Sequence, residues 1–374
     1  MQISQLLLMS LPVFAVLIAV EWLYGWIIGR STYRINDVIS SLSQGMLSQA
    51  IAVCTKLFQI GLYSIIFSKI AVFPKLSWWS SGVGWLVAIV LFDFCDYWLH
   101  RAGHEIAILW AAHVVHHQSE DFNFSTALRQ ESFVPLLGWM FYVPMAVLGV
   151  PPEQFAVAGL VVLLYQFWIH TEHIGKLGWF DRLFSSPSNH RVHHAINPQY
   201  INKNYGGMLV IWDRLFGTFA EENEECVYGT KTPLQSWDPV WAVTSGYAAL
   251  AKDAIHTRRW RDKLRIWFMP TGWRPADVIE SALNNPLEQV RRYDPALRQA
   301  QVLFVIAEFI LLLVITAMLL VHEETLDETH AVVISIAIAG GLWLIGAVLQ
   351  SRLRIVAAMI ATVPVMAVST FVLM

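Results

Sequence analysis

Runs of about 20 apolar residues recur along this chain and constrain its fold more than any other feature, because a helix of about that length crosses the hydrocarbon core of a bilayer. Hydrophobic residues make up 56% of the 374 residues and charged residues only 14%, whereas a typical soluble domain has about 45–50% and about 25%. Within lipid, every backbone polar group must be satisfied inside the protein, which favours helices. We therefore predict an all-α, polytopic integral membrane protein.

Eight apolar segments are candidates for membrane helices. They are residues 6–28, 47–72, 82–99, 133–150, 153–169, 300–321, 331–349 and 355–373. The fourth and fifth are joined by Pro151-Pro152. So tight a connection predicts a helical hairpin, about 133–169, that enters and leaves the membrane on one side.

The charged residues are concentrated elsewhere. Residues 174–299 are a third of the chain but hold 29 of its 53 charged residues, which predicts a helical cap outside the hydrocarbon core. We divide the chain into N-terminal transmembrane helices (1–99), a histidine-rich core that includes the hairpin (100–230), the remaining cap (231–299) and C-terminal transmembrane helices (300–374).

The distribution of Lys and Arg predicts the orientation in the membrane. Arg30 and Arg101 follow the first and third segments, and Arg352 and Arg354 precede the last. The loop 322–330 has four acidic residues and no basic one, and counting segments places it on the opposite side. Basic loops remain in the cytoplasm, so we expect the cap and the histidines there, in a bacterial inner membrane or the endoplasmic reticulum.

Histidine is the second unusual feature of the composition. Ten of the 13 histidines lie between residues 100 and 194, in four clusters with spacings of three and four. These spacings place side chains on one face of a helix, and unpaired imidazoles near lipid are costly, so the clusters predict a metal site. The candidate ligands are His100, His104, His113, His116, His117, His170, His173, His190, His193 and His194.

Eight to ten histidines are too many for a single ion, since a structural zinc takes four ligands. The pattern therefore predicts a dinuclear site. The three cysteines, Cys54, Cys95 and Cys226, are scattered, which excludes iron–sulfur clusters and thiolate-bound haem. Two iron ions that activate O₂ are the main hypothesis, two hydrolytic zinc ions are the alternative, and zinc can replace iron in a purified protein. A membrane metal carrier or sensor is the rival without catalysis, although no chain of polar residues crosses the predicted helices.

Carboxylates beside the histidines are candidates for orienting them, because a ligand imidazole usually donates its other N–H to a carboxylate or carbonyl. Asp96 precedes His100 by one helical turn inside an apolar segment, where an unpaired Asp is costly. Glu131 and Glu172 are the further candidates for such a catalytic role, and Glu172 lies between two histidines in the sequence HTEH.

The histidine motifs and their neighbours resemble the fatty acid hydroxylase/sterol desaturase superfamily. The resemblance covers roughly residues 90–230 and is closest to the alkylglycerol monooxygenases, which cleave ether lipids with tetrahydrobiopterin. It rests on DYW and HR at 96–101, WAAHVVHHQSEDFNFSTALR at 110–129, YQFWIHTEHIGKLG at 165–178, SNHRVHH at 188–194 and KNYGGMLVIWDRLFGTF at 203–219. It implies nine of the ten histidines as iron ligands. His173 and Asn189 depart from the ether-lipid pattern.

The resemblance implies a di-iron monooxygenase that hydroxylates a lipid C–H bond. If that bond adjoins an ether oxygen, the hemiacetal formed collapses to an aldehyde and a glycerol derivative. Fatty-acyl or sterol hydroxylation or desaturation is the alternative. The expected cofactors are two iron ions, O₂ and tetrahydrobiopterin or another external electron donor, which a partner protein can supply. The lipid is expected to enter from the bilayer, and a net charge of −3 excludes a polybasic nucleic-acid binder.

Two groups of basic residues lie near these motifs. Arg129, Arg191 and Lys203 are expected at the rim of the site, or as ordinary solvated charges. Residues 256–268 (HTRRWRDKLRIWF) combine five basic residues with two Trp and one Phe. This pattern predicts a helix lying in the membrane interface, with its basic side towards anionic headgroups.

Overall fold

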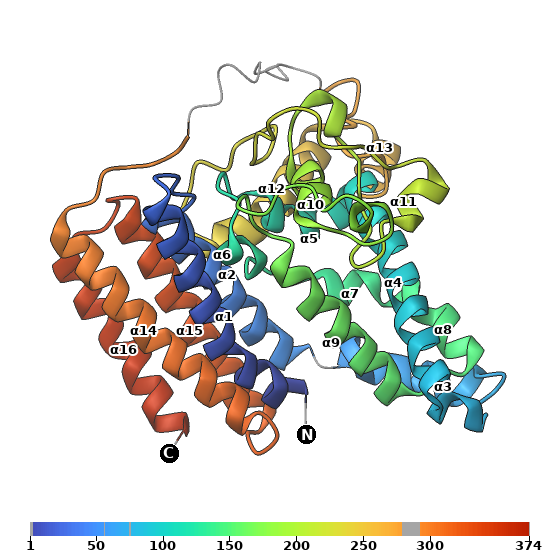
Figure 1. Ribbon diagram of the computed structural model, residues 1–374. Helices are drawn as coiled ribbons and strands as arrows, with labels where there is room; N and C mark the ends of the chain where they lie inside the picture. The colour runs from blue at the N-terminus through green and yellow to red at the C-terminus, as the bar shows by residue number, and fades with distance from the viewer. Residues whose placement is uncertain (1–2, 56, 75, 279–291, 374) are drawn as a thin grey trace.

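The protein is all-helical throughout the part that the computed structural model describes, namely residues 3–55, 57–74, 76–278 and 292–373 (Figure 1). Only three isolated β-bridges occur among these residues, for example between Ile106 and Pro270. The predicted all-α fold is therefore confirmed. Residues 279–291 of the predicted cap lie outside the described residues.

Four described helices are long and apolar enough to cross a membrane, which makes this a multi-pass membrane protein. They are α1 (Ile3–Ile27), α4 (Gly82–Glu105), α14 (Gln299–His322) and α15 (Glu328–Leu349). Four of the eight predicted segments therefore form helices of full spanning length among the described residues. The last predicted segment forms the apolar helix α16 (Ile355–Leu373).

The prediction of one continuous helix over 47–72 is wrong. The structure has α2 (Ile35–Cys54), a π-helical turn (Leu57–Gly61) and the separate helix α3 (Leu62–Ile70). α2 also begins earlier than the apolar run, in a polar stretch whose side chains find partners inside the protein. The buried amide of Gln44, for instance, donates to the carbonyl of Pro239 (3.0 Å). Such tertiary partners are invisible to a hydropathy window.

The predicted hairpin is also more broken than expected. Its first arm consists of α7 (Val134–Gly138), the 3-10 turn Trp139–Tyr142 and α8 (Val143–Leu148), whereas its second arm is the single helix α9 (Pro152–Trp168). Pro135 and Pro144 stand in the first turns of α7 and α8. Proline has no N–H for the helical ladder, so it begins a helix better than it continues one.

Figure 1 shows how these helices divide. α14, α15 and α16 stand beside α1 and α2 on one side, and α3, α4, α8 and α9 form the other. α15 packs against α2, α14 and α16, and α4 packs against α9 and α5. Gly341 of α15 allows the close approach of α14, because a Cβ there would lie 2.6 Å from a methyl group of Leu312.

The cap lies at one end of the molecule, and the acidic loop 323–327 between α14 and α15 lies at the other (Figure 1). The cap is made of short helices joined by long connections. They are α5 (Ala107–His117), α6 (Phe124–Ala127), α10 (Pro187–His194), α11 (Ile211–Phe216), α12 (Pro239–His256) and α13 (Trp260–Arg265), with single 3-10 turns at Phe180–Arg182 and Pro198–Tyr200. The 3-10 turn Ser77–Ser80 lies outside the cap, directly before α4.

Candidate metal centre

Nine of the ten predicted histidines converge where the cap meets α4. They come from four places that are far apart in the sequence: the last turns of α4, the last turns of α5, the residues after α9, and α10. Five of them, His100, His104, His113, His117 and His193, form a first group, and four, His116, His170, His190 and His194, form a second. Within each group, one nitrogen of every ring lies within 4.8 Å of those of the others.

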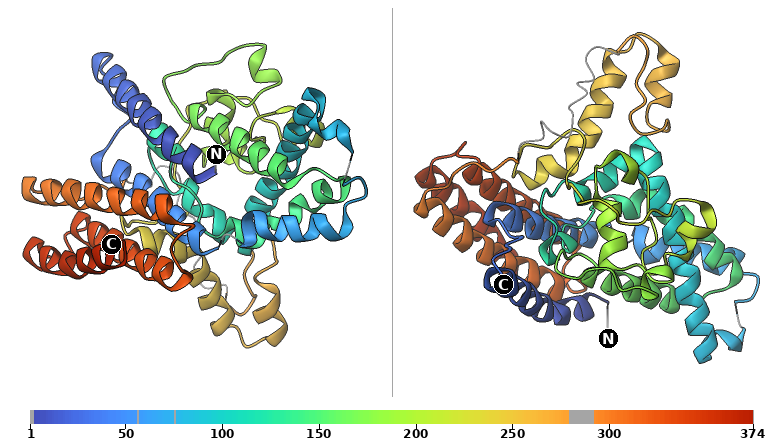
Figure 2. Two further views of the ribbon diagram at one scale, coloured as in Figure 1. Left: turned by 90° about the horizontal axis from the view of Figure 1, so that it is seen from below. Right: turned by 45° about the horizontal axis from the view of Figure 1, so that its top comes forward.

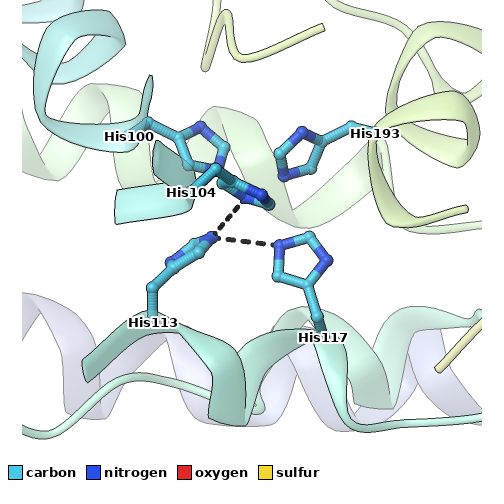
Figure 3. Close-up of side chains that lie close together, drawn as sticks. All are labelled: His100, His104, His113, His117 and His193. Carbon is cyan, nitrogen blue, oxygen red and sulfur yellow. Dashed lines mark hydrogen bonds between the residues drawn. The ribbon is translucent and has the colours of Figure 1, made fainter. Parts of the chain in front are cut away.

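In the first group the imidazoles point towards a common centre (Figure 3). The Nε2 atom of His113 lies 3.0 Å from Nε2 of His104 and 3.0 Å from Nε2 of His117. His100 and His193 close the group from opposite sides, with ring centroids 4.3 Å apart. The Nε2 atoms of both have no hydrogen-bond partner among the described residues, although both are buried.

The second group has the same construction. Nε2 of His170 lies 3.3 Å from Nε2 of His116 and 3.0 Å from Nε2 of His190, which is 3.2 Å from Nε2 of His194. The two groups adjoin, because the rings of His117 and His194 stack with centroids 4.3 Å apart. The two groups of candidate ligands are therefore direct neighbours.

The outer ring nitrogens are tied to backbone carbonyls, which fixes the direction of the inner ones. The acceptors for Nδ1 are Tyr205 for His100 (2.7 Å), Arg129 for His116 (2.9 Å), Gln166 for His170 (2.7 Å) and Lys203 for His193 (3.1 Å). A carbonyl only accepts, so each Nδ1 must carry the proton and each Nε2 presents a lone pair to the centre.

Glu131 provides the one carboxylate that contacts a histidine of the two groups in the described structure. Its Oε1 pairs with Nδ1 of His113. Burial favours the neutral acid, but the neighbouring His113 outweighs it and lowers the pKa of Glu131 to about 2. The ionised carboxylate therefore holds the His113 ring with its Nε2 towards the centre.

Burial also keeps the imidazoles of the second group neutral. It lowers the pKa of His116 to about 4, and it lowers the pKa values of His170, His190 and His194 well below the usual range. Neutral imidazole is the form that binds metals. At pH 7 these side chains could therefore bind a metal ion without first releasing a proton.

The spacing fits two metal ions. Two imidazoles on one ion, each at about 2.1 Å and about 90–110° apart, have nitrogens about 3.0–3.4 Å from each other. The Nε2–Nε2 distances in both groups are 3.0–3.3 Å. Lone pairs that face one another so closely repel unless a cation lies between them, and the two unpartnered Nε2 atoms gain a partner in the same way.

His173 is not part of either group. Its ring lies against α1, edge-on to Tyr24 with centroids 5.3 Å apart, and its Nε2 would be 3.1 Å from a Cβ at Gly25. The prediction that HTEH lies on one helix is wrong, because α9 ends at Trp168. His170 instead closes the end of α9, with Nδ1 donating to the carbonyl of Gln166.

The other two predicted carboxylates have different partners. Asp96 accepts a hydrogen bond from the Tyr142 hydroxyl (2.9 Å) in place of the predicted imidazole. Glu172 pairs with Arg30 (2.8 Å) and belongs to neither histidine group. Of the rim residues, Arg129 is fully buried and donates to the carbonyl of Val115 (2.6 Å) at the end of α5.

The loop that begins at Lys203 was expected at the rim of the site, but the sequence did not predict that two of its carbonyls orient histidines. Asp93 accepts hydrogen bonds from the N–H groups of Met208 (2.7 Å) and Leu209 (3.1 Å) and from the Trp212 indole (2.8 Å). Asp213 accepts from the N–H groups of Tyr205 and Gly206. The position of Asp93 inside an apolar segment indicated that its carboxylate must have partners, and these partners are the backbone N–H groups of the loop and the Trp212 indole.

A cavity of about 590 Å³ opens beside the histidines and extends among the membrane helices. His100, His113, His116 and His170 form one end, together with Asp96, Glu131 and Gln166. The rest is apolar and is contributed by α1, α2, α9 and α14, with side chains such as Phe14, Met46, Leu163, Phe309 and Leu313. The shape suits an aliphatic chain whose end lies at the histidines.

Known proteins share the sequence that builds this centre. Residues 85–218 match the family model described as fatty acid hydroxylase. The chain is 36% identical to an alkylglycerol monooxygenase of Danio rerio, covering 91% of this chain and 77% of the relative, and 35% identical to that of Homo sapiens, covering 86% and 71%. It is 33% identical to an ornithine lipid hydroxylase of Rhizobium tropici over 38% of this chain and 43% of that one.

No solved structure matches the chain. The matched region 85–218 contains all nine converging histidines, and the two alkylglycerol monooxygenases extend the similarity over most of the membrane helices. Similarity of this extent at more than 30% identity establishes the family. The chain therefore belongs to the fatty acid hydroxylase/sterol desaturase superfamily, and it is a lipid monooxygenase of that superfamily.

Proposed function

We propose that the two histidine groups hold two iron ions, the first ion by five imidazoles and the second by four. The observation that carries this proposal is the Nε2 spacing of 3.0–3.3 Å between rings whose Nδ1 atoms are tied outward. Imidazole also suits other transition metals, and iron is favoured because the chain is a monooxygenase. Bound iron would supply the activation of O₂ and the two-electron oxidation of the substrate.

The protein's own contribution is to hold the ligands and to exclude water. Glu131 keeps His113 oriented, and the carbonyls of Tyr205, Arg129, Gln166 and Lys203 do the same for four other rings. The burial of the site keeps these contacts strong and the oxidising chemistry away from solvent. His173, which lies apart, is proposed to pack against α1 and to bind no metal.

The substrate that we propose is an alkylglycerol ether lipid. The relatives that match most of their length are alkylglycerol monooxygenases, and the cavity offers an apolar channel that ends at the histidines. Oxidation of the carbon next to the ether oxygen inserts one oxygen atom of O₂, and the other leaves as water with two electrons and two protons from a reductant. The resulting hemiacetal breaks into a fatty aldehyde and glycerol.

This reaction determines where the headgroup must lie. The oxidised carbon is bonded to the ether oxygen, so the glycerol must lie within one or two bonds of the reacting centre. The polar end of the cavity provides hydrogen-bonding partners for its hydroxyl groups. Asp96, held by Tyr142, faces the same space as Glu131 and Gln166. We assign Asp96 to the recognition of the glycerol hydroxyls.

The reductant is proposed to be tetrahydrobiopterin or another external donor, and the cap is proposed to face the cytoplasm. The orientation is supported by the acidic loop 323–327 at the end opposite the cap, together with the basic loops at the cap end. The protein is proposed to lie in a bacterial inner membrane or in the endoplasmic reticulum.

The test is to load the purified protein with iron in lipid nanodiscs and to supply a 1-O-alkylglycerol, tetrahydrobiopterin and O₂. We expect a fatty aldehyde and about two iron ions per chain. His170→Ala should lower the iron content towards one ion and abolish the aldehyde, whereas the matched variant His173→Ala should retain both ions. Hydroxylated acyl lipid or sterol without aldehyde would instead support the alternative substrates, and equal iron loss in both variants would contradict the two ligand groups.

A further inference from the structure

An amphipathic arm projects from the cap and takes no part in the metal centre. It consists of α12, the turn 257–259, α13 and the segment that follows α13 as far as Asp277, and we call it the α12–α13 arm. Figure 2 shows it extending well beyond the rest of the molecule in both views, and in the view from below it lies outside the outline of the membrane helices.

The arm is firmly built. Arg274 makes two 2.6 Å hydrogen bonds to Asp253, and the ammonium of Lys263 donates to the carbonyls of Ala254 (2.8 Å) and Ile255 (2.9 Å) at the end of α12. Asp277 accepts from the backbone N–H of Arg258 (2.9 Å). These side-chain contacts hold α12, α13 and the segment that follows them together as one folded unit.

The outer face of the arm exposes four large apolar side chains to solvent. Ile255 is 72% exposed, Trp260 78%, Leu264 71% and Phe268 71%. The last three are spaced four residues apart, so they lie on one side of the chain as it follows α13. A contiguous exposed patch of large apolar side chains on a cap marks a site of interaction with a membrane or a protein.

The charges around the patch identify the partner. Arg258, Arg259 and Arg261 are exposed on the same segment, Lys263 and Arg265 are partly exposed, and the one acid between them, Asp262, is buried beside Arg265. A surface that combines Trp and Phe with a net positive charge matches the headgroup region of an anionic bilayer, where aromatic rings and basic groups both find favourable surroundings.

The arm is attached to the body of the molecule beside the cap end of α4. Backbone hydrogen bonds join Ala107 to Met269 (3.0 Å), Ile108 to Trp267 (2.8 Å) and Thr271 to Glu105 (3.1 Å). These bonds fasten the arm to the cap end of α4, which is a membrane-spanning helix. The arm therefore leaves the body at the point where α4 ends and α5 begins.

We propose that the α12–α13 arm is a bilayer-docking surface. Trp260, Leu264 and Phe268 enter the interface of the membrane that the helices already span, and the exposed arginines bind the phosphates of anionic lipids. Because the arm is fastened to the junction between His104 and His113, this docking also fixes the height of the metal centre above the lipid.

Spin-label depth measurements test this proposal. Trp260→Cys and, separately, Leu264→Cys are labelled with a nitroxide in a Cys54→Ser background, since Cys54 is exposed and the other two cysteines are buried. Glu225→Cys, exposed elsewhere on the cap, is the matched control. In phosphatidylcholine nanodiscs with phosphatidylglycerol, we expect a ratio of oxygen to nickel-complex collisions about threefold higher at 260 and 264 than at 225. Equal ratios at all three sites would overturn the proposal.

The charge component has its own readout. Replacing Arg258, Arg259 and Arg261 together by Gln should lower the collision ratio at 264 in the anionic discs to the value seen in discs of phosphatidylcholine alone. An unchanged ratio would show that the arginines do not select anionic lipid. Labels that become immobilised without gaining oxygen accessibility would identify a protein contact instead, and would also overturn the proposal. Unaltered iron content verifies that each variant is folded.

Discussion

The carboxylate of Glu131 makes the most consequential single contact at the proposed metal centre, because it fixes the ring of His113, whose Nε2 lies 3.0 Å from the Nε2 atoms of two other candidate ligands. Carboxylates that orient a ligand histidine typically change metal affinity by about 10–100-fold when removed. We therefore predict that Glu131→Ala lowers the iron affinity of the first group by about this factor, measured by competition with a chelator.

Glu131→Gln should lose less affinity, since its amide oxygen still accepts from the His113 Nδ1–H. Glu172→Ala is the control, because Glu172 pairs with Arg30 outside the two groups, and it should bind iron as the native protein does. A Glu131→Ala variant with native affinity would show that the pairing has no influence on the site.

The buried imidazoles also predict how the metal-free protein responds to acid. The pKa of His116 falls from 6.5 to about 4 on burial, so the unfolded chain binds protons more readily than the folded one between these values. Stability is then fully present above pH 6.5 and decreases as the pH falls towards 4. We expect the Tm of the metal-free protein to decrease over this range, measured by differential scanning fluorimetry in detergent, and to a smaller degree in the variant His116→Gln. A Tm independent of pH in both proteins would contradict neutral burial.

At the scale of elements, the loop 203–209 connects the membrane helix α4 to the candidate ligands on α10. It is held by Asp93 and Asp213, and it carries the carbonyls that orient His100 and His193. Removing a buried acceptor leaves its donors unsatisfied, at about 1–3 kcal/mol for each. We predict that Asp93→Ala lowers the Tm and the iron content of the first group, so that the ratio of iron to protein falls from two towards one.

Asp253→Ala gives the matched comparison for that prediction. Asp253 is paired with Arg274 in the α12–α13 arm, so its loss should weaken the arm and leave both ions bound. If the two variants lost iron equally, the effect of Asp93 would be general destabilisation and the loop would have no specific role.

The elements also explain which sequence predictions held. Spacings of three and four brought His100 with His104 on α4 and the histidines of α5 and α10 onto their helical faces, because such spacing is a local property of a helix. His170 and His173 have the same spacing, but α9 ends before them. The pairing of Asp96 with Tyr142, and that of Glu131 with His113, depend on contacts 46 and 18 residues apart in the sequence, which local patterns do not reveal.

At the scale of the whole molecule, the cavity is lined by helices that have different roles but that hydropathy alone does not distinguish. α1, α9 and α14 all read as generic apolar helices, yet they enclose the apolar end of the cavity, while α4 and α5 supply its histidine end. The helices predicted to span the membrane are thus also the walls of the cavity that is proposed to receive the lipid. A substrate that approaches from the bilayer would pass between them without leaving an apolar environment.

This arrangement predicts that the residues lining the end of the cavity far from the histidines determine which alkyl-chain lengths the protein binds. Ala317 of α14 lines the cavity together with Leu11 and Phe14 of α1. Ala317→Trp should fill the far end and raise KM for long-chain alkylglycerols by about tenfold, which is the effect of losing burial for roughly two methylene groups, while short-chain substrates keep a native KM. Val314→Trp is the matched control, because Val314 lies one turn away, is 51% exposed and does not line the cavity. A uniform change in kcat for all chain lengths in Ala317→Trp would mean that the helix had moved the metal centre. An unchanged preference would mean that the lipid tail lies elsewhere.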